Sequence, residues 1–124
     1  MKLTTQEIQD AIVKQRAELA PRESKAILVY EIKRRKVAAR VVLWCTKSAT
    51  GDYMTYYVRF YDTRYGITAS ADILQYPDGF SHSKKGNWSI VTPVMSDMLR
   101  KIMRALYKAY GFRKKELNEY NLWD

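Results

Sequence analysis

The sequence is poor in the residues from which hydrolases and metalloenzymes build reactive centres. Among its 124 residues it has one cysteine, Cys45, and one histidine, His82. A single cysteine excludes an intramolecular disulfide framework and a multi-cysteine zinc site, and a single histidine excludes any site that needs two imidazoles. The five glycines are scattered and form no phosphate-binding loop. We therefore predict a protein without catalytic residues, metal or cofactor, and keep a hydrolase or nuclease as the alternative.

The nuclease alternative depends on carboxylates. Glu31 and Lys33 match the Glu-x-Lys half of a restriction-type site, and the acid that should precede them is Glu23. An extended strand separates Glu23 from Glu31 by roughly 26 Å, which is too far for one shared metal. We therefore expect Glu23 and Glu31 to have structural roles and not to bind a metal together.

The chain also lacks long apolar segments. No stretch approaches the roughly 18 consecutive apolar residues of a membrane span, and no apolar run follows Lys2, as a signal peptide requires. We expect a cytoplasmic protein that makes no membrane contact. The lone Cys45 fits this location, and its apolar neighbours predict a small buried side chain.

The apolar pattern predicts a helix near each end of the chain. Thr4 and Glu7 form a capping box, followed by apolar residues at helical spacing, so we expect a helix over 5–19. Ser96 is the predicted N-cap of the second helix, and Gly111 is its predicted stop. The apolar stripe of this second helix comprises Met95, Leu99, Ile102, Met103, Leu106 and Tyr110.

Between these helices, β-branched and aromatic residues predict an antiparallel sheet of about four to five strands. The expected strands span residues 26–32, 37–45, 53–61, 67–74 and 88–91. A helix after Pro21 is the alternative for the first strand, and a helical turn is the alternative within 67–74. Residues 33–36 are expected at a hairpin tip, and residues 81–87 are expected to form a polar loop.

One α+β domain over residues 1–124 is the predicted fold, with the N-terminal helix, the sheet and a C-terminal helix packed on the sheet. Residues 113–124 are expected to be a basic and then aromatic tail, with one more helical turn as the alternative.

Positive charge is in large excess and is clustered. Lys and Arg number 22 against 13 Asp and Glu, giving a net charge of +9 and a pI of about 9.7. Such values are typical of nucleic-acid-binding domains. Residues 33–36 are all basic, and no acid occurs from 98 to 115. In the second helix, Arg100, Arg104 and Lys108 repeat every four residues, about 6 Å apart along the axis, although a solvated helix face gives the same row.

Ten tyrosines are the second unusual feature. Alternation along 53–61 divides the residues between two faces of one strand. One face carries Met54, Tyr56, Val58 and Phe60, and the other carries Tyr53, Tyr57, Arg59 and Tyr61. Exposed tyrosines on a sheet stack unpaired bases, whereas tyrosines under a helix belong to the core. The sequence leaves open which face the helix covers.

These features predict a non-enzymatic nucleic-acid-binding protein, selective for single strands or for shape. Basic residues of the hairpin and helix would neutralise phosphates, and sheet tyrosines would stack bases. The residues predicted to bind are Arg34, Arg35, Tyr53, Tyr57, Arg59, Tyr61, Arg100, Lys101, Arg104 and Lys108. The alternative is a small basic protein-binding module or inhibitor, of the kind that mobile elements encode, which engages an acidic or nucleic-acid-processing protein.

Overall fold

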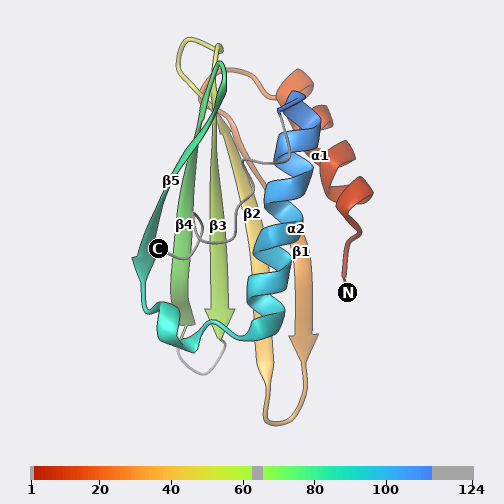
Figure 1. Cartoon of the computed structure of the whole chain (residues 1–124), viewed down its shortest axis with the longest axis vertical. Helices are drawn as coiled ribbons and strands as arrows, with labels where there is room; N and C mark the ends of the chain where they lie inside the picture. The colour runs from red at the N-terminus through yellow and green to blue at the C-terminus, as the bar shows by residue number, and fades with distance from the viewer. Residues whose placement is uncertain (1, 63–65, 113–124) are drawn as a thin grey trace.

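Two helices cover one face of a five-stranded antiparallel sheet (Figure 1). The computed structural model describes residues 2–62 and 66–112. Its elements are α1 (Thr5–Glu18), β1 (Ser24–Lys33), β2 (Ala38–Lys47), β3 (Met54–Asp62), β4 (Gly66–Tyr76), β5 (Gly79–Gly86), the 3-10 helix η1 (Trp88–Ile90) and α2 (Pro93–Tyr110). The predicted α+β fold is therefore confirmed, while the predicted tail at 113–124 lies outside the described residues.

Local chemistry sets the helix ends. In α1 the capping box is present: the Thr4 hydroxyl accepts from the Glu7 amide at 3.1 Å, and the Glu7 carboxylate accepts from the Thr4 amide at 3.1 Å. The predicted start of α2 at Ser96 is wrong. Thr92 is the N-cap and Pro93 follows it, because proline fixes a helical φ and has no amide hydrogen to leave unsatisfied at this position. Gly111 ends α2 with a φ of +73°, as predicted.

The strands form a simple meander in which each strand pairs with the next along the chain. Both helical alternatives are wrong, because residues 24–33 form β1 and residues 66–76 form β4. The predicted loop at 81–87 falls largely within β5, and the predicted strand at 88–91 is replaced by η1. β5 has a loop-like composition because it is an edge strand, which pairs with β4 through its backbone and packs Phe80 against the core.

The core lies between the helices and the inner face of the sheet. The largest fully buried side chains include Leu43, Tyr56, Phe60, Ile73, Met98, Ile102 and Leu106. Helices α1 and α2 run side by side in the same direction (Figure 1). Near their C-terminal ends, the Arg16 guanidinium lies 3.7 Å from the Tyr110 ring centroid and donates to the Ala109 carbonyl at 3.1 Å. The Tyr110 and Tyr56 hydroxyl oxygens are 2.5 Å apart, so this cluster joins both helices to β3.

Two bulges determine which residues share a face. In β1 the register shifts between Leu28 and Tyr30, so that Glu31 pairs with Arg40. In β4 the register shifts so that Ile67 pairs with Tyr61. Bulges of this kind reorient the following side chains. Without the bulge in β1, Glu31 would point to the face opposite Arg40.

Gly86 has a conformation and a close contact that only glycine tolerates. Its φ is +85°, and an added Cβ would lie 2.8 Å from the Thr68 carbonyl oxygen. We expect Gly86→Ala to lower the free energy of unfolding by about 1–3 kcal/mol. Gly79→Ala is the control, since nothing lies within 4 Å of its added Cβ. Urea unfolding of both variants tests this, and equal midpoints would contradict the strain at Gly86.

Candidate nucleic-acid interface

The face of the sheet opposite the helices, here called the open face, is covered by no helix within residues 2–62 and 66–112. Cross-strand partners lie on the same face of a sheet, so the register gives its composition. Its four rows, read from β1 toward β5, are Ser24, Thr46, Thr55, Leu74 and Ser81; Ala26, Trp44, Tyr57, Asp72 and Ser83; Leu28, Val42, Arg59, Ser70 and Lys85; and Glu31, Arg40, Tyr61 and Ile67.

Three aromatic side chains stand on this face. Trp44 and Tyr57 are direct cross-strand partners, and Tyr61 follows Tyr57 on the same strand after about 13 Å. Trp44 is 38% exposed, while the two tyrosines are half-buried. Between Trp44 and Tyr61 lies an open depression of about 490 Å³, with Val42 and Leu28 in its lining. The rings of the open face are therefore accessible rather than sealed under a helix.

Two cations flank one carboxylate in the middle of the open face. Asp72 is 3.2 Å from Arg59 Nη1 and 3.1 Å from Lys85 Nζ. The same Arg59 places its guanidinium carbon 5.0 Å from the centroid of the Tyr57 ring. A guanidinium at this distance is attracted by the ring's electrons. Asp72 thus orients Arg59 over an aromatic ring, and the group keeps an excess positive charge.

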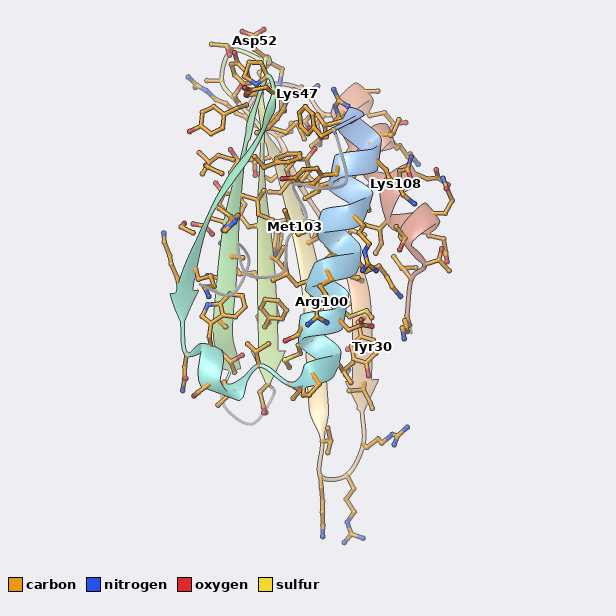
Figure 2. All side chains as sticks on the ribbon, in the orientation of Figure 1. Tyr30, Lys47, Asp52, Arg100, Met103 and Lys108 are labelled. Carbon is orange, nitrogen blue, oxygen red and sulfur yellow. The ribbon has the colours of Figure 1, made fainter. Side chains whose placement is uncertain are left out.

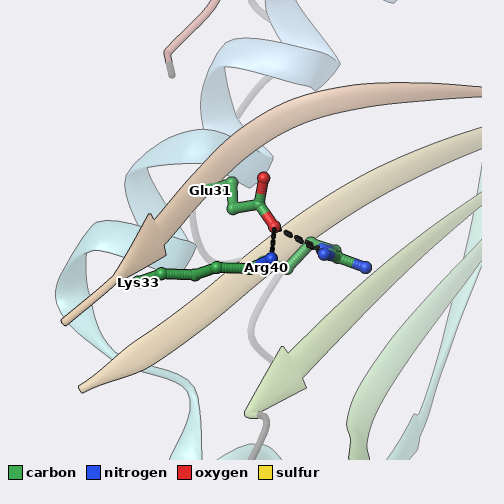
Figure 3. A network of polar contacts seen from close by, with 3 residues as sticks. All are labelled: Glu31, Lys33 and Arg40. Carbon is green, nitrogen blue, oxygen red and sulfur yellow. Dashed lines mark hydrogen bonds and ion pairs between the residues drawn. The ribbon is translucent and has the colours of Figure 1, made fainter. Parts of the chain in front are cut away.

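A second ionic cluster lies at the base of the β1–β2 hairpin (Figure 3). One carboxylate oxygen of Glu31 accepts from Arg40 at 2.5 Å and 3.1 Å and lies 3.4 Å from Lys33 Nζ. The hydrogen bond from Arg40 lowers the pKa of Glu31 below its usual 4.5, so the carboxylate stays ionised near neutral pH.

The Glu-x-Lys pattern is therefore part of an ionic cluster, in which Glu31 pairs with Lys33 on the same strand and with Arg40 on β2. Glu23, the other acid of the nuclease interpretation, accepts from the Ala20 amide at 2.6 Å. Within the described parts of the chain, no group of three or more His, Cys, Asp or Glu residues is placed to hold a metal ion.

The predicted binding residues fall into three separate places. Tyr57, Arg59 and Tyr61 lie on the open face, and Tyr53 is 45% exposed just before β3, at the end of that face away from the hairpin. Arg34 and Arg35 lie at the tip of the β1–β2 hairpin. The remaining four are on α2, on the helix side of the sheet, where Figure 2 labels Arg100 and Lys108.

In the basic row on α2, two of the four cations already contact other groups of the protein, which the sequence spacing does not indicate. Arg100 lies 4.0 Å from Asp97, and Lys101 donates to the Leu3 carbonyl at 3.4 Å. Arg104 and Lys108 are exposed. A ligand on the open face cannot contact this row without passing around an edge of the sheet.

Sequence reasoning did not include two residues of the open face, Trp44 and Arg40, among the predicted binding residues. Trp44 and Arg40 both alternate with the apolar residues of β2, and that alternation was the available signal. That alternation places Trp44 and Arg40 on the face opposite the core residues of β2. It does not show that they lie beside Tyr57 and Tyr61. Strand order and register supply that information.

Cys45 and His82, the one cysteine and the one histidine of the chain, lie in different surroundings. Cys45 is fully buried, and burial raises the pKa of its thiol to about 12, so it stays protonated at neutral pH. His82 lies on the helix side of β5, while its neighbours Ser81 and Ser83 lie on the open face. Burial, together with the nearby Lys84, lowers the pKa of His82 below its usual 6.5.

No protein-family model matches the chain, and neither a curated protein nor a solved structure is significantly similar to it. None of the helices in the described ranges is long and apolar enough to cross a membrane.

Neighbouring tyrosines of β3 test this assignment of faces. Tyr56 is fully buried and contacts Tyr110, so we expect Tyr56→Ala to lower the free energy of unfolding by about 3–5 kcal/mol. Tyr57 lies on the open face, and Tyr57→Ala should lower it by only about 1 kcal/mol. Chemical denaturation of both variants measures the difference. If Tyr57→Ala unfolds the domain, Tyr57 belongs to the core and is not free to bind.

Proposed function

We propose that this protein is a non-enzymatic nucleic-acid-binding domain that holds a single strand on the open face of its sheet. The observation that carries the proposal is the open face itself, where Trp44, Tyr57 and Tyr61 are accessible beside Arg40 and Arg59. Flat rings bind unpaired bases of any sequence, and interleaved guanidinium groups bind the phosphates between them.

The charges of the open face support this ligand. The ionic groups of the two clusters are the cations Lys33, Arg40, Arg59 and Lys85 and the carboxylates Glu31 and Asp72. The excess of cations attracts a polyanion, and the ion pairs hold each guanidinium in a defined position. Side chains already held in place lose less conformational entropy when a ligand binds.

The exposed cations of α2 have a secondary part in this proposal. Arg104 and Lys108 add to the overall positive field, which accelerates the approach of nucleic acid, but they contact no strand on the open face. The proposal assigns no catalytic residue. We propose a cytoplasmic location, supported by the unpaired thiol of Cys45.

One observation favours a second candidate, a module that binds a protein. Three aliphatic side chains are exposed on the open face: Leu28 at 42%, Ile67 at 63% and Leu74 at 41%. Aliphatic groups gain more from packing against a protein than from bases, and the paired ions are typical of an interface rim. An acidic or nucleic-acid-processing protein would then occupy the same face.

Binding of labelled oligonucleotides separates these candidates. We expect Tyr57→Ala and Trp44→Ala each to weaken single-strand binding by about 1–3 kcal/mol, because each removes one stacking ring. Tyr57→Phe keeps the ring and should bind like the unchanged protein. If about four phosphates are neutralised, the slope of log K against log salt should be near −3 on a single strand.

A charge-matched pair provides the control for electrostatics. Arg59→Ala and Arg104→Ala each remove one positive charge, but only Arg59 lies on the open face. Arg59→Ala should therefore weaken binding more than Arg104→Ala does. Absence of oligonucleotide binding at low salt would contradict the nucleic-acid proposal and favour the protein-binding candidate.

A further inference from the structure

The β1–β2 hairpin extends past the rest of the sheet as a narrow basic arm, here defined as residues 33–38. Ala39 is the first residue of β2 that pairs with β3, where it lies opposite Asp62. The arm therefore pairs only within its own hairpin, and it forms the lowest part of the molecule in Figure 1. Four consecutive cations, residues 33–36, occupy it.

The turn at the end of the arm is as tight as a hairpin allows. The Arg34 amide donates to the Val37 carbonyl at 2.7 Å, and the Val37 amide donates to the Arg34 carbonyl at 3.2 Å. Only Arg35 and Lys36 lie between them. The arm is thus two strands wide, with backbones about 5 Å apart. In Figure 2, nitrogen-tipped side chains at this end point away from the body.

Ion pairs hold the base of the arm in place, whereas the positive charges at its tip have no carboxylate partner among the described residues. Glu31 joins β1 to Arg40 of β2 and also contacts Lys33 (Figure 3). Beyond this cluster, Arg34, Arg35 and Lys36 are exposed, and no ion pair joins them to any carboxylate of the described residues. Three cations are therefore presented on a support that is already ordered.

We propose that this arm enters a groove of double-stranded nucleic acid, so that the protein binds a junction between a duplex and a single strand. The major groove of B-DNA, about 12 Å wide, admits a two-stranded β-ribbon. The tip cations would then contact phosphates on both sides of the groove. The inference rests on the proposed function, because the single-stranded part of the ligand lies on the open face.

The position of the arm connects the two parts of the ligand. The row of the open face that contains Tyr61 and Arg40 also contains Glu31, which lies two residues before Lys33 and the start of the arm. A single strand that follows the aromatic side chains toward this end reaches the arm directly. The tip has one exposed apolar residue, Val37, and no aromatic residue. Hot spots of protein interfaces combine arginines with buried aromatic anchors, and the tip has arginines but no such anchor, so this composition favours nucleic acid over an acidic protein.

Three probes test the arm: a short blunt duplex, one of its strands alone, and the same duplex with a single-stranded tail. The arm variant carries Arg34→Ala, Arg35→Ala and Lys36→Ala. The control variant carries Lys14→Ala, Arg104→Ala and Lys108→Ala, which remove the same charge from exposed positions on the helices. Far-ultraviolet circular dichroism and urea midpoints confirm that both variants fold.

We expect the unchanged protein to bind the tailed duplex more tightly than either other probe. The arm variant should lose at least about tenfold in affinity for both duplex probes, with a salt slope smaller by about 2 to 3. Its affinity for the single strand should equal that of the control variant. The control variant should retain the preference for the tailed duplex.

The outcomes separate this inference from the proposed function. Equal losses of affinity for the duplex probes in the arm and control variants would contradict a specific contact between the arm and the duplex, since net charge alone would then explain them. Duplex binding that depends on the arm, without any single-strand binding, would support the arm's duplex contact and overturn the open-face proposal. If polyglutamate competes for the protein as well as a duplex of equal charge does, the arm does not recognise a nucleic-acid groove. That result would indicate an acidic protein as the partner. If the unchanged protein binds none of the three probes, both proposals fail.

Discussion

The rest of the structure depends on the packing of two helices against a single face of the sheet. Every apolar residue of β3 that alternates inward is buried beneath them: Met54, Tyr56, Val58 and Phe60. This burial is the main favourable contribution to folding. The hydroxyl contact between Tyr56 and Tyr110, and the stacking of Arg16 on Tyr110, then fix how the helices sit on β3. Because one face supplies the core, the other face is free to carry charges and exposed rings.

The bulge in β1 links the core to the surface. It turns Val29 and Tyr30 toward the helices in succession, where the Leu3 amide donates to the Val29 carbonyl at 3.0 Å. The following residue, Glu31, therefore returns to the open face opposite Arg40. The ion pair at the base of the arm thus depends on a packing requirement on the other side of the sheet. A change that removes the bulge would alter the open face without touching any of its side chains.

Much of the fold could be predicted from the sequence because its signals are local. The capping box of Thr4 and Glu7, the glycine stop at Gly111 and the period-two alternation of 53–61 each depend on neighbouring residues. Prediction failed where local composition and tertiary context disagree. β5 is polar because it is an edge strand, and Pro93 begins a helix that its position after a presumed strand did not indicate.

The candidate site was less predictable, because it depends on which elements meet. Both faces of β3 are rich in aromatic residues, so composition alone did not tell which one the helices cover. The same is true of α2, since a helix that follows a sheet can pack against either face. The sequence assigns the basic row of α2 and the tyrosines of β3 to one function without placing them relative to each other, and they lie on opposite sides of the sheet.

Because the cations lie on two sides of the sheet, the net charge of +9 does not act on a single ligand as a whole. Charges in solution are screened over about 8 Å at physiological ionic strength, and the exposed cations of α2 lie on the helix side of the sheet, across the core from the open face. The cations of α2 therefore contribute to the long-range field but contact no ligand on the open face. A rigid partner on one face would neutralise only the cations of that face. A ligand that neutralises both the open face and the arm must follow the sheet to its end and continue past it, which a flexible polyanion does more readily than a compact protein.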